Sequence, residues 1–213
     1  MAEQAPFKRL VVGSSPTRLT TPSPGPAVDH RDHVALLRDG VPAAHDGNRL
    51  WADLGSGTGA FTLALAELLG AGGSVASVDR DAAALAVQAE AMRARFPDVA
   101  LEQHVADFTT DLGVPPLDGV VMANALHFQR DREATVRHVY GMLRLGGRFV
   151  LVEYDADSGN PWVPYPLSFG TWKSMAVRCG FDEPTLLGRI PSRFLGAIYS
   201  ALAIRPATDA GRP

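Results

Sequence analysis

The chain has 213 residues, a length that fits one α/β domain and leaves little room for a second. Hydrophobic residues make up 46% of it and the formal net charge is −3, which argues against a protein that holds a nucleic-acid backbone over a long footprint. A single cysteine, Cys179, excludes an internal disulfide, and no apolar run is long enough to span a bilayer. We therefore expect a cytoplasmic protein without nucleic-acid or membrane partners.

Residues 1–28 are predicted to form a flexible N-terminal arm. The prolines in this stretch are Pro6, Pro16, Pro22, Pro24 and Pro26. Prolines at this density prevent a helix and weaken strand pairing. The stretch lacks the continuous apolar core of a secretory signal, but its scarcity of acidic residues leaves a transit peptide as the alternative to disorder. Such an arm is either a solvated tail or a flap that orders over bound substrate.

A short helix is predicted next, from Asp29 to about Leu37, with Asp29 as its N-cap. His30 and His33 lie in this helix. We interpret them as solvated or packing residues, with a catalytic role open to them only if the helix lines the pocket.

Strand and helix patterns then alternate with unusual regularity. Short apolar runs predict five strands, at residues 50–54, 74–78, 100–106, 119–124 and 148–153. Apolar residues at helical spacing predict helices at residues 60–70, 81–96 and 131–146, the last of them capped by Asp131. Near-continuous apolar strands in this order predict a parallel sheet covered by helices on both faces, which is a three-layer αβα sandwich.

The last part of the chain departs from this pattern. A helix is predicted at residues 171–179, followed by two strands at residues 185–190 and 197–204. The few residues between these strands cannot make a parallel crossover, so the pair should be antiparallel. The sequence thus predicts a mostly parallel sheet that ends in an antiparallel pair.

A glycine-rich segment, Asp53-Leu54-Gly55-Ser56-Gly57-Thr58-Gly59, follows the first predicted strand. Its three glycines let the backbone turn tightly and approach a ligand closely. The segment has three interpretations: a strand–turn–helix junction that merely needs glycines, a dinucleotide-binding loop, or a loop for S-adenosylmethionine (SAM). Asp79, at the end of the second strand, suits a ribose diol in either ligand, because a carboxylate accepts two hydroxyl hydrogens at once.

Two features favour SAM over a dinucleotide. Asp53 would place a negative charge near a pyrophosphate, which is unfavourable, whereas the ammonium of a methionine moiety would attract it. In addition, a dinucleotide fold does not require the antiparallel strands at the end of the chain.

With these features in order, the chain resembles class I SAM-dependent methyltransferases over residues 29–205, which leaves residues 206–213 as a C-terminal tail. The segments that carry the resemblance are residues 53–59, 78–81, 106–108, 117–127, 143–149 and 179–181. The resemblance implies an α/β fold with a seven-stranded, mostly parallel sheet whose last strand is antiparallel. It also implies that SAM is the cofactor.

The resemblance further implies which residues bind the cofactor. These residues are Asp53, Gly55, Ser56, Gly57, Gly59, Asp79, Arg80, Asp107, Phe108 and Asn124. Within this set the resemblance gives Asp79 to the ribose hydroxyls and Asp107 to the adenine amino group, and it places Phe108 beside the adenine ring.

The chemistry of methyl transfer limits what the protein must supply. The reaction is an in-line displacement with a neutral thioether as leaving group, so a base is needed only for a nucleophile that arrives protonated. His127, just past the fourth strand, is our candidate for that base, and the alternative is that it shapes the pocket or packs beneath it. Trp162, Tyr165 and Phe169 lie on a proline-rich loop that suits a flat or apolar small molecule, unless they only anchor the loop.

Other functions are disfavoured by specific residues. Asn124-Ala125-Leu126-His127 lacks the Asn-Pro-Pro-Tyr pattern of enzymes that methylate amino groups of nucleic acids and proteins. Glu153, Asp155 and Asp157 follow the fifth strand, but no carboxylate ends the fourth, so we expect no metal site and interpret these acids as solvated or turn-forming. We therefore predict methyl transfer to oxygen or nitrogen of a small molecule. The rivals are a SAM- or nucleotide-binding module without transferase activity and, less favoured, a nicotinamide oxidoreductase.

Overall fold

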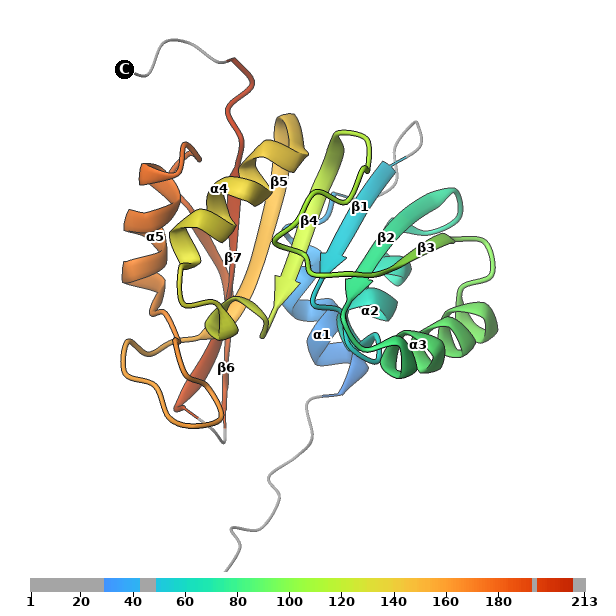
Figure 1. Ribbon diagram of the computed structural model, residues 1–213, viewed down its shortest axis with the longest axis horizontal. Coiled ribbons are helices and arrows are strands. Elements are labelled where there is room, and N and C mark those ends of the chain that lie inside the picture. Colours follow the sequence, from blue (N-terminus) through green and yellow to red (C-terminus); the bar gives the residue numbers. More distant parts are fainter. Residues whose placement is uncertain (1–28, 43–48, 193–194, 209–213) are drawn as a thin grey trace, which may run out of the picture.

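One twisted sheet organises the molecule, which we describe from a computed structural model (Figure 1). The structure describes residues 29–42, 49–192 and 195–208, so the predicted arm and the last five residues of the predicted tail lie outside it. The strands are β1 (Arg49–Leu54), β2 (Gly73–Asp79), β3 (Ala100–Val105), β4 (Leu117–Ala123), β5 (Leu143–Tyr154), β6 (Thr185–Pro191) and β7 (Ala197–Ile204). Their order across the sheet is β3-β2-β1-β4-β5-β7-β6, and β7 runs antiparallel to both of its neighbours. The predicted sheet is confirmed.

Helices cover both faces of this sheet. The elements are α1 (His30–Arg38), α2 (Ala60–Leu69), α3 (Ala82–Arg95), the 3₁₀ turn η1 (Leu126–Phe128), α4 (Arg132–Met142) and α5 (Phe169–Arg178). One hydrophobic core joins α1, α2 and α3 to one face, and a second core joins α4 and α5 to the other face. This arrangement confirms the three-layer sandwich.

Local signals in the sequence set where most helices begin. The side chains of Asp29, Asp81 and Asp131 each accept a hydrogen bond from a backbone N–H in the first turn of the helix that follows. The N-caps predicted at Asp29 and Asp131 are thereby confirmed. Helix α5 begins two residues earlier than predicted, because Ser168 caps it and the Asp155 carboxylate accepts the Phe169 N–H.

The end of α4 differs from the prediction. We expected the helix to continue to about residue 146, but it ends at Met142, and β5 begins at Leu143. Leu143 pairs with Leu117 of β4, and the register then shifts before regular pairing resumes. Gly146 adopts a φ of 73° and donates its N–H to the carbonyl of Arg205. Pairing with distant strands therefore overrides the helical spacing of this segment.

Close packing of a tryptophan on a glycine gives a first prediction. Trp51 is buried, and a Cβ on its strand partner Gly119 would lie 2.4 Å from the indole ring. We expect Gly119→Ala to lower the free energy of unfolding by about 1–3 kcal/mol through overpacking. Urea denaturation measures this, with Gly141→Ala on α4 as the control, because a Cβ at Gly141 meets nothing within 4 Å. Equal stabilities of the two variants would contradict the prediction.

Candidate functional site

The glycine segment forms a tight turn between β1 and α2. Gly55, Gly57 and Gly59 have φ values of 78°, 53° and 94°, a region that side-chain-bearing residues rarely adopt. The N–H groups of Gly55 and Ser56 donate to the Val78 carbonyl at 2.9 and 3.1 Å, which ties the turn to the end of β2. The three glycines are thus required by backbone conformation.

Asp79 fixes the middle of this turn. Its Oδ2 accepts the N–H of Gly57 at 2.8 Å, and its Oδ1 accepts the N–H of Asp81 at 2.9 Å. Both carboxylate oxygens therefore take backbone hydrogen bonds, and each keeps a further lone pair for a ligand.

A pocket opens beside the turn, at the carboxyl ends of β1 to β4. It is a cavity of about 230 Å³, and its lining residues are Gly55, Asp79, Arg80, Phe108, Asn124, Ala125, Phe128 and Gln129. A Cβ on Gly55 would lie 2.6 Å from Ala125 Cβ and 3.4 Å from Phe108, so only glycine leaves this cradle open. The chain turns in opposite directions after β1 and β4, which is where open α/β sheets bind ligands.

The pocket gathers part of the predicted cofactor set. The predicted residues that line it are Gly55, Asp79, Arg80, Phe108 and Asn124. Asn124 adopts a φ of 51°, the one positive value among the described non-glycine residues. Asp53 and Ser56 are instead buried and do not line the pocket. Ala125, Phe128 and Gln129 were not predicted, and their only sequence signal is their position just after the fourth strand.

Asp107 lies beside the pocket and is engaged by neighbouring side chains. Its carboxylate accepts hydrogen bonds from the N–H and hydroxyl of Thr109 at 3.0 and 2.8 Å and pairs with the Arg80 guanidinium. Desolvation pushes the pKa of Asp107 upward, but the Thr109 hydrogen bonds and Arg80 outweigh it and lower the pKa below its usual value. Asp107 is therefore held as a carboxylate and positions Arg80 at the pocket edge.

Asp53 has a different environment. It is 1% exposed, and its Oδ2 accepts the Thr62 hydroxyl at 2.6 Å. Burial raises the pKa of Asp53 to about 7, against the lowering effect of Thr62, and the charge of Asp79 adds to the rise. Its ionisation thus falls near neutral pH.

This shift predicts a pH-dependent stability. The unfolded chain loses the Asp53 proton near pH 3.8, while the folded chain keeps it to about pH 7. The raised pKa therefore adds to the free energy of unfolding. This added stability is fully present below pH 3.8 and is lost as the pH rises to about 7, a change on the order of 4 kcal/mol. Asp53→Asn, which stays neutral, should flatten that part of the curve in urea denaturation between pH 4 and 8. Parallel curves for the two proteins would rule the shift out.

His127 and Glu153 form a buried pair at the ends of β4 and β5. The Glu153 carboxylate accepts the backbone N–H of His127 at 3.0 Å and contacts its Nδ1 at 3.0 and 3.1 Å. It also accepts the Tyr154 N–H at 3.1 Å. The His127 side chain is 4% exposed and packs against the rings of Phe128 and Tyr154. A carboxylate only accepts hydrogen bonds, so in the neutral imidazole the proton lies on Nδ1 and Nε2 is the ring nitrogen that carries a lone pair.

Glu153 corrects a prediction. We interpreted it as solvated or turn-forming, but it is fully buried. The sequence signalled this burial only through the predicted fold. The pairing of Ala123 with Val152 brings the following residues of β4 and β5 to the same edge of the sheet, next to His127.

Comparisons with known proteins bear on this arrangement. Residues 52–149 match the methyltransferase domain family. The arsenite methyltransferase of Aquipseudomonas alcaligenes is 32% identical over 166 residues, which cover 69% of this chain and 48% of that protein. The chain carries a class I SAM-dependent methyltransferase domain. It spans about half the length of this curated relative.

Solved structures share the fold of this methyltransferase. The arsenic(III) SAM methyltransferase from Chlamydomonas reinhardtii superimposes with a TM-score of 0.62 at 19% identity, over 82% of this chain and 68% of that one. The Burkholderia thailandensis 1,6-didemethyltoxoflavin N1-methyltransferase, crystallised with S-adenosylhomocysteine, gives a TM-score of 0.66 at 18% identity, over 83% and 78% of the two chains. At these identities the likeness establishes the fold alone.

The proline-rich loop of the methyltransferase contacts the turn that contains His127. The N–H of Tyr165 donates to the His127 carbonyl at 3.0 Å, and Trp162 and Tyr165 are 76% and 40% exposed. Phe169 instead packs on the buried Tyr199. Of the three predicted aromatics, Phe169 is therefore an anchor, while Trp162 and Tyr165 remain accessible.

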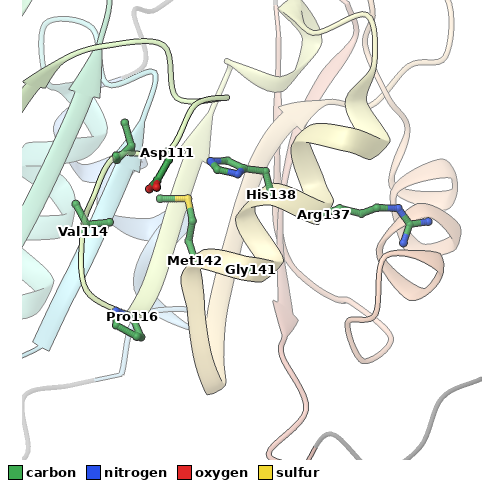
Figure 2. Close-up of a pocket in the computed structure, with 8 residues that line it drawn as sticks. Asp111, Val114, Pro116, Arg137, His138, Gly141 and Met142 are labelled. Atoms are coloured by element: carbon green, nitrogen blue, oxygen red, sulfur yellow. The ribbon is translucent and has the colours of Figure 1, made fainter.

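The two histidines of α1 and a second cavity lie away from the pocket beside the glycine segment. His30 hydrogen-bonds Glu67 at 2.7 Å and His33 packs on Phe61, so both histidines of α1 face α2. A separate cavity of about 380 Å³ lies between α4 and the β3–β4 connection. In Figure 2 Asp111 and His138 converge in this cavity, whereas Arg137 points away from it.

Among the described residues no helix is long and apolar enough to cross a membrane.

Proposed function

We propose that this methyltransferase transfers a methyl group to an oxygen or nitrogen of a small molecule, with His127 as the base. The observation that carries the proposal is the buried contact between Nδ1 of His127 and Glu153. It supports a tautomer in which Nε2 accepts a proton, and the carboxylate stabilises the imidazolium that results. The new bond joins the acceptor atom to the methyl carbon as the carbon–sulfur bond breaks, and the acceptor's proton passes to Nε2.

The cofactor residues are part of the same proposal. SAM would supply a methyl group bonded to a sulfonium sulfur. The leaving group of the transfer is then a neutral thioether. We infer that Asp79 binds the ribose hydroxyls, because both of its carboxylate oxygens are held by backbone N–H groups and keep lone pairs for a ligand. We also infer that Phe108 packs beside the adenine. Asp53, Gly55, Ser56, Gly57, Gly59, Arg80, Asp107 and Asn124 complete the proposed site. The open cradle at Gly55 supports close approach of the ligand to the backbone.

The exposed aromatics support a flat or apolar acceptor. Phe128 is 59% exposed and lines the pocket, while Trp162 and Tyr165 lie on the loop that is hydrogen-bonded to His127. Aromatic rings that remain accessible beside a pocket provide stacking surface for a planar molecule. We therefore propose a hydroxylated or amino-bearing aromatic compound as acceptor.

Arsenite is a second candidate acceptor, because the curated relative is an arsenite methyltransferase. Arsenic(III) is soft and favours thiolate ligands, as other soft centres do. Cys179 is the only cysteine of this chain, it is buried, and its Sγ lies 3.7 Å from the Glu133 carbonyl on α4. Burial raises the pKa of this thiol, which disfavours the thiolate. The cysteine content therefore favours an oxygen or nitrogen acceptor.

An acceptor screen with methyl-labelled SAM tests these alternatives. The panel contains phenols, aromatic amines and arsenite, with S-adenosylhomocysteine binding measured in parallel by calorimetry. Label on phenols or amines supports the proposal, and label on arsenite alone overturns it. Tight S-adenosylhomocysteine binding without any labelled product would favour the alternative of a binding module.

A further inference from the structure

Gln88 of α3 is a polar residue on a buried helix face. Leu85 and Met92, which share that face, are apolar and pack in the interior, whereas Gln88 is 0% exposed and carries an amide. Burying an amide costs free energy unless its hydrogen bonds are replaced. The environment of Gln88 must therefore supply partners for both ends of the side chain.

One end of the amide leads to the beginning of the glycine segment. Gln88 Nε2 donates to Thr62 Oγ1 at 2.8 Å, and the Thr62 hydroxyl donates to Asp53 Oδ2 at 2.6 Å. Since the threonine proton is used on Asp53, its oxygen is an acceptor for Gln88. The bond directions are thus consistent along this branch.

The other end of the amide leads to the middle of the glycine segment. Gln88 Oε1 accepts the Ser77 hydroxyl at 2.7 Å and Gln103 Nε2 at 2.9 Å. Because the Ser77 proton goes to Gln88, the 2.7 Å contact between Ser56 and Ser77 is a donation from Ser56. The two donors at Oε1 also fix which way the amide points.

Gln88 also contacts the end of the glycine segment directly. A Cβ on Gly59 would lie 2.5 Å from Gln88 Cγ and 3.3 Å from its Nε2. The side chain therefore packs against the residue that begins α2, while its hydrogen bonds reach Asp53 and Ser56. A single buried side chain therefore reaches all three parts of the turn. It contacts the end directly, and one intermediate residue links it to the beginning and another to the middle.

We propose that Gln88 is a positioning residue for SAM binding, which holds the glycine segment in its binding conformation through Asp53 and Ser56. A fully satisfied polar network specifies one geometry, whereas an apolar side chain in the same place would fill the volume without orienting either partner. The inference rests on the proposed cofactor site and is independent of His127 and of the acceptor.

Calorimetric titration with S-adenosylhomocysteine tests the proposal on folded protein. Gln88→Leu should weaken binding about tenfold, because it removes the hydrogen bonds that orient the turn. Gln103→Leu is the matched control: Gln103 bonds the same Oε1 and the Leu85 carbonyl but no residue of the glycine segment. That variant should lower the thermal midpoint and leave affinity within about twofold.

A second pair of variants decides the question if Gln88→Leu does not fold. Thr62→Val keeps the shape of the side chain but breaks the branch to Asp53, while Thr62→Ser keeps the hydroxyl. Weaker binding by Thr62→Val with near-normal binding by Thr62→Ser supports the positioning role. Affinity that falls equally in Gln88→Leu and Gln103→Leu, or that is unchanged in both Gln88→Leu and Thr62→Val, overturns it. Because binding is read without an acceptor, failure here leaves the proposed reaction untouched.

Discussion

Replacing His127 by glutamine is expected to lower kcat by about 10²- to 10⁴-fold, the range that a positioned base contributes. Glutamine keeps a side-chain donor for the buried Glu153 carboxylate, so the fold should survive, but it cannot accept a proton at neutral pH. Affinity for S-adenosylhomocysteine should change little, because the described part of the cofactor pocket is lined by other residues. Single-turnover rates with the acceptor found in the screen provide the measurement.

The matched control is His138→Gln. His138 lies on α4 beside the second cavity, where its Nε2 contacts the Thr110 carbonyl at 3.1 Å, and it has no part in the proposed reaction. It should keep kcat within about twofold, as distant surface substitutions do. Glu153→Gln should have a kcat between those of His127→Gln and His138→Gln, since the charge that stabilises the imidazolium is lost. A His127→Gln enzyme with nearly full kcat would show that the acceptor is attacked without this base.

Features that depend on neighbours in sequence were predictable. The glycines at Gly55, Gly57 and Gly59 follow from a turn that only they can make, and the caps at Asp29 and Asp131 follow from hydrogen bonds within one helical turn. The antiparallel direction of the last strand was also predictable, because the short link between the last two strands excludes a parallel crossover.

Features that depend on distant partners were not predictable in the same way. The burial of Glu153 requires knowing that β5 lies beside β4, which the sequence suggests only through the fold. The early end of α4 comes from the pairing of Leu143 with Leu117, although its helical spacing continues. Gln88 left a weak signal, since it is a polar residue three positions after Leu85 on an apolar face, but its partners come from three other elements.

Asp79→Ala is expected to raise the Kd for S-adenosylhomocysteine by about 100-fold. The charged acceptor for the ribose hydroxyls is lost, and hydrogen bonds to charged groups contribute about 1.5–3 kcal/mol each. The N–H of Gly57 also loses its 2.8 Å partner, which loosens the turn that the ligand contacts. Isothermal titration calorimetry measures the change directly.

Asp81→Ala separates this loss from a general loss of stability. Asp81 lies two residues away and caps α3, with its carboxylate accepting the N–H groups of Ala83 and Ala84 at 2.9 and 3.2 Å. Its removal should cost about 1 kcal/mol of unfolding free energy and leave affinity within about threefold. If both variants bind S-adenosylhomocysteine equally well, Asp79 does not hold the ribose. If only Asp79→Ala binds S-adenosylhomocysteine weakly while its stability matches that of Asp81→Ala, the Asp79 carboxylate contributes to binding directly and not by stabilising the fold.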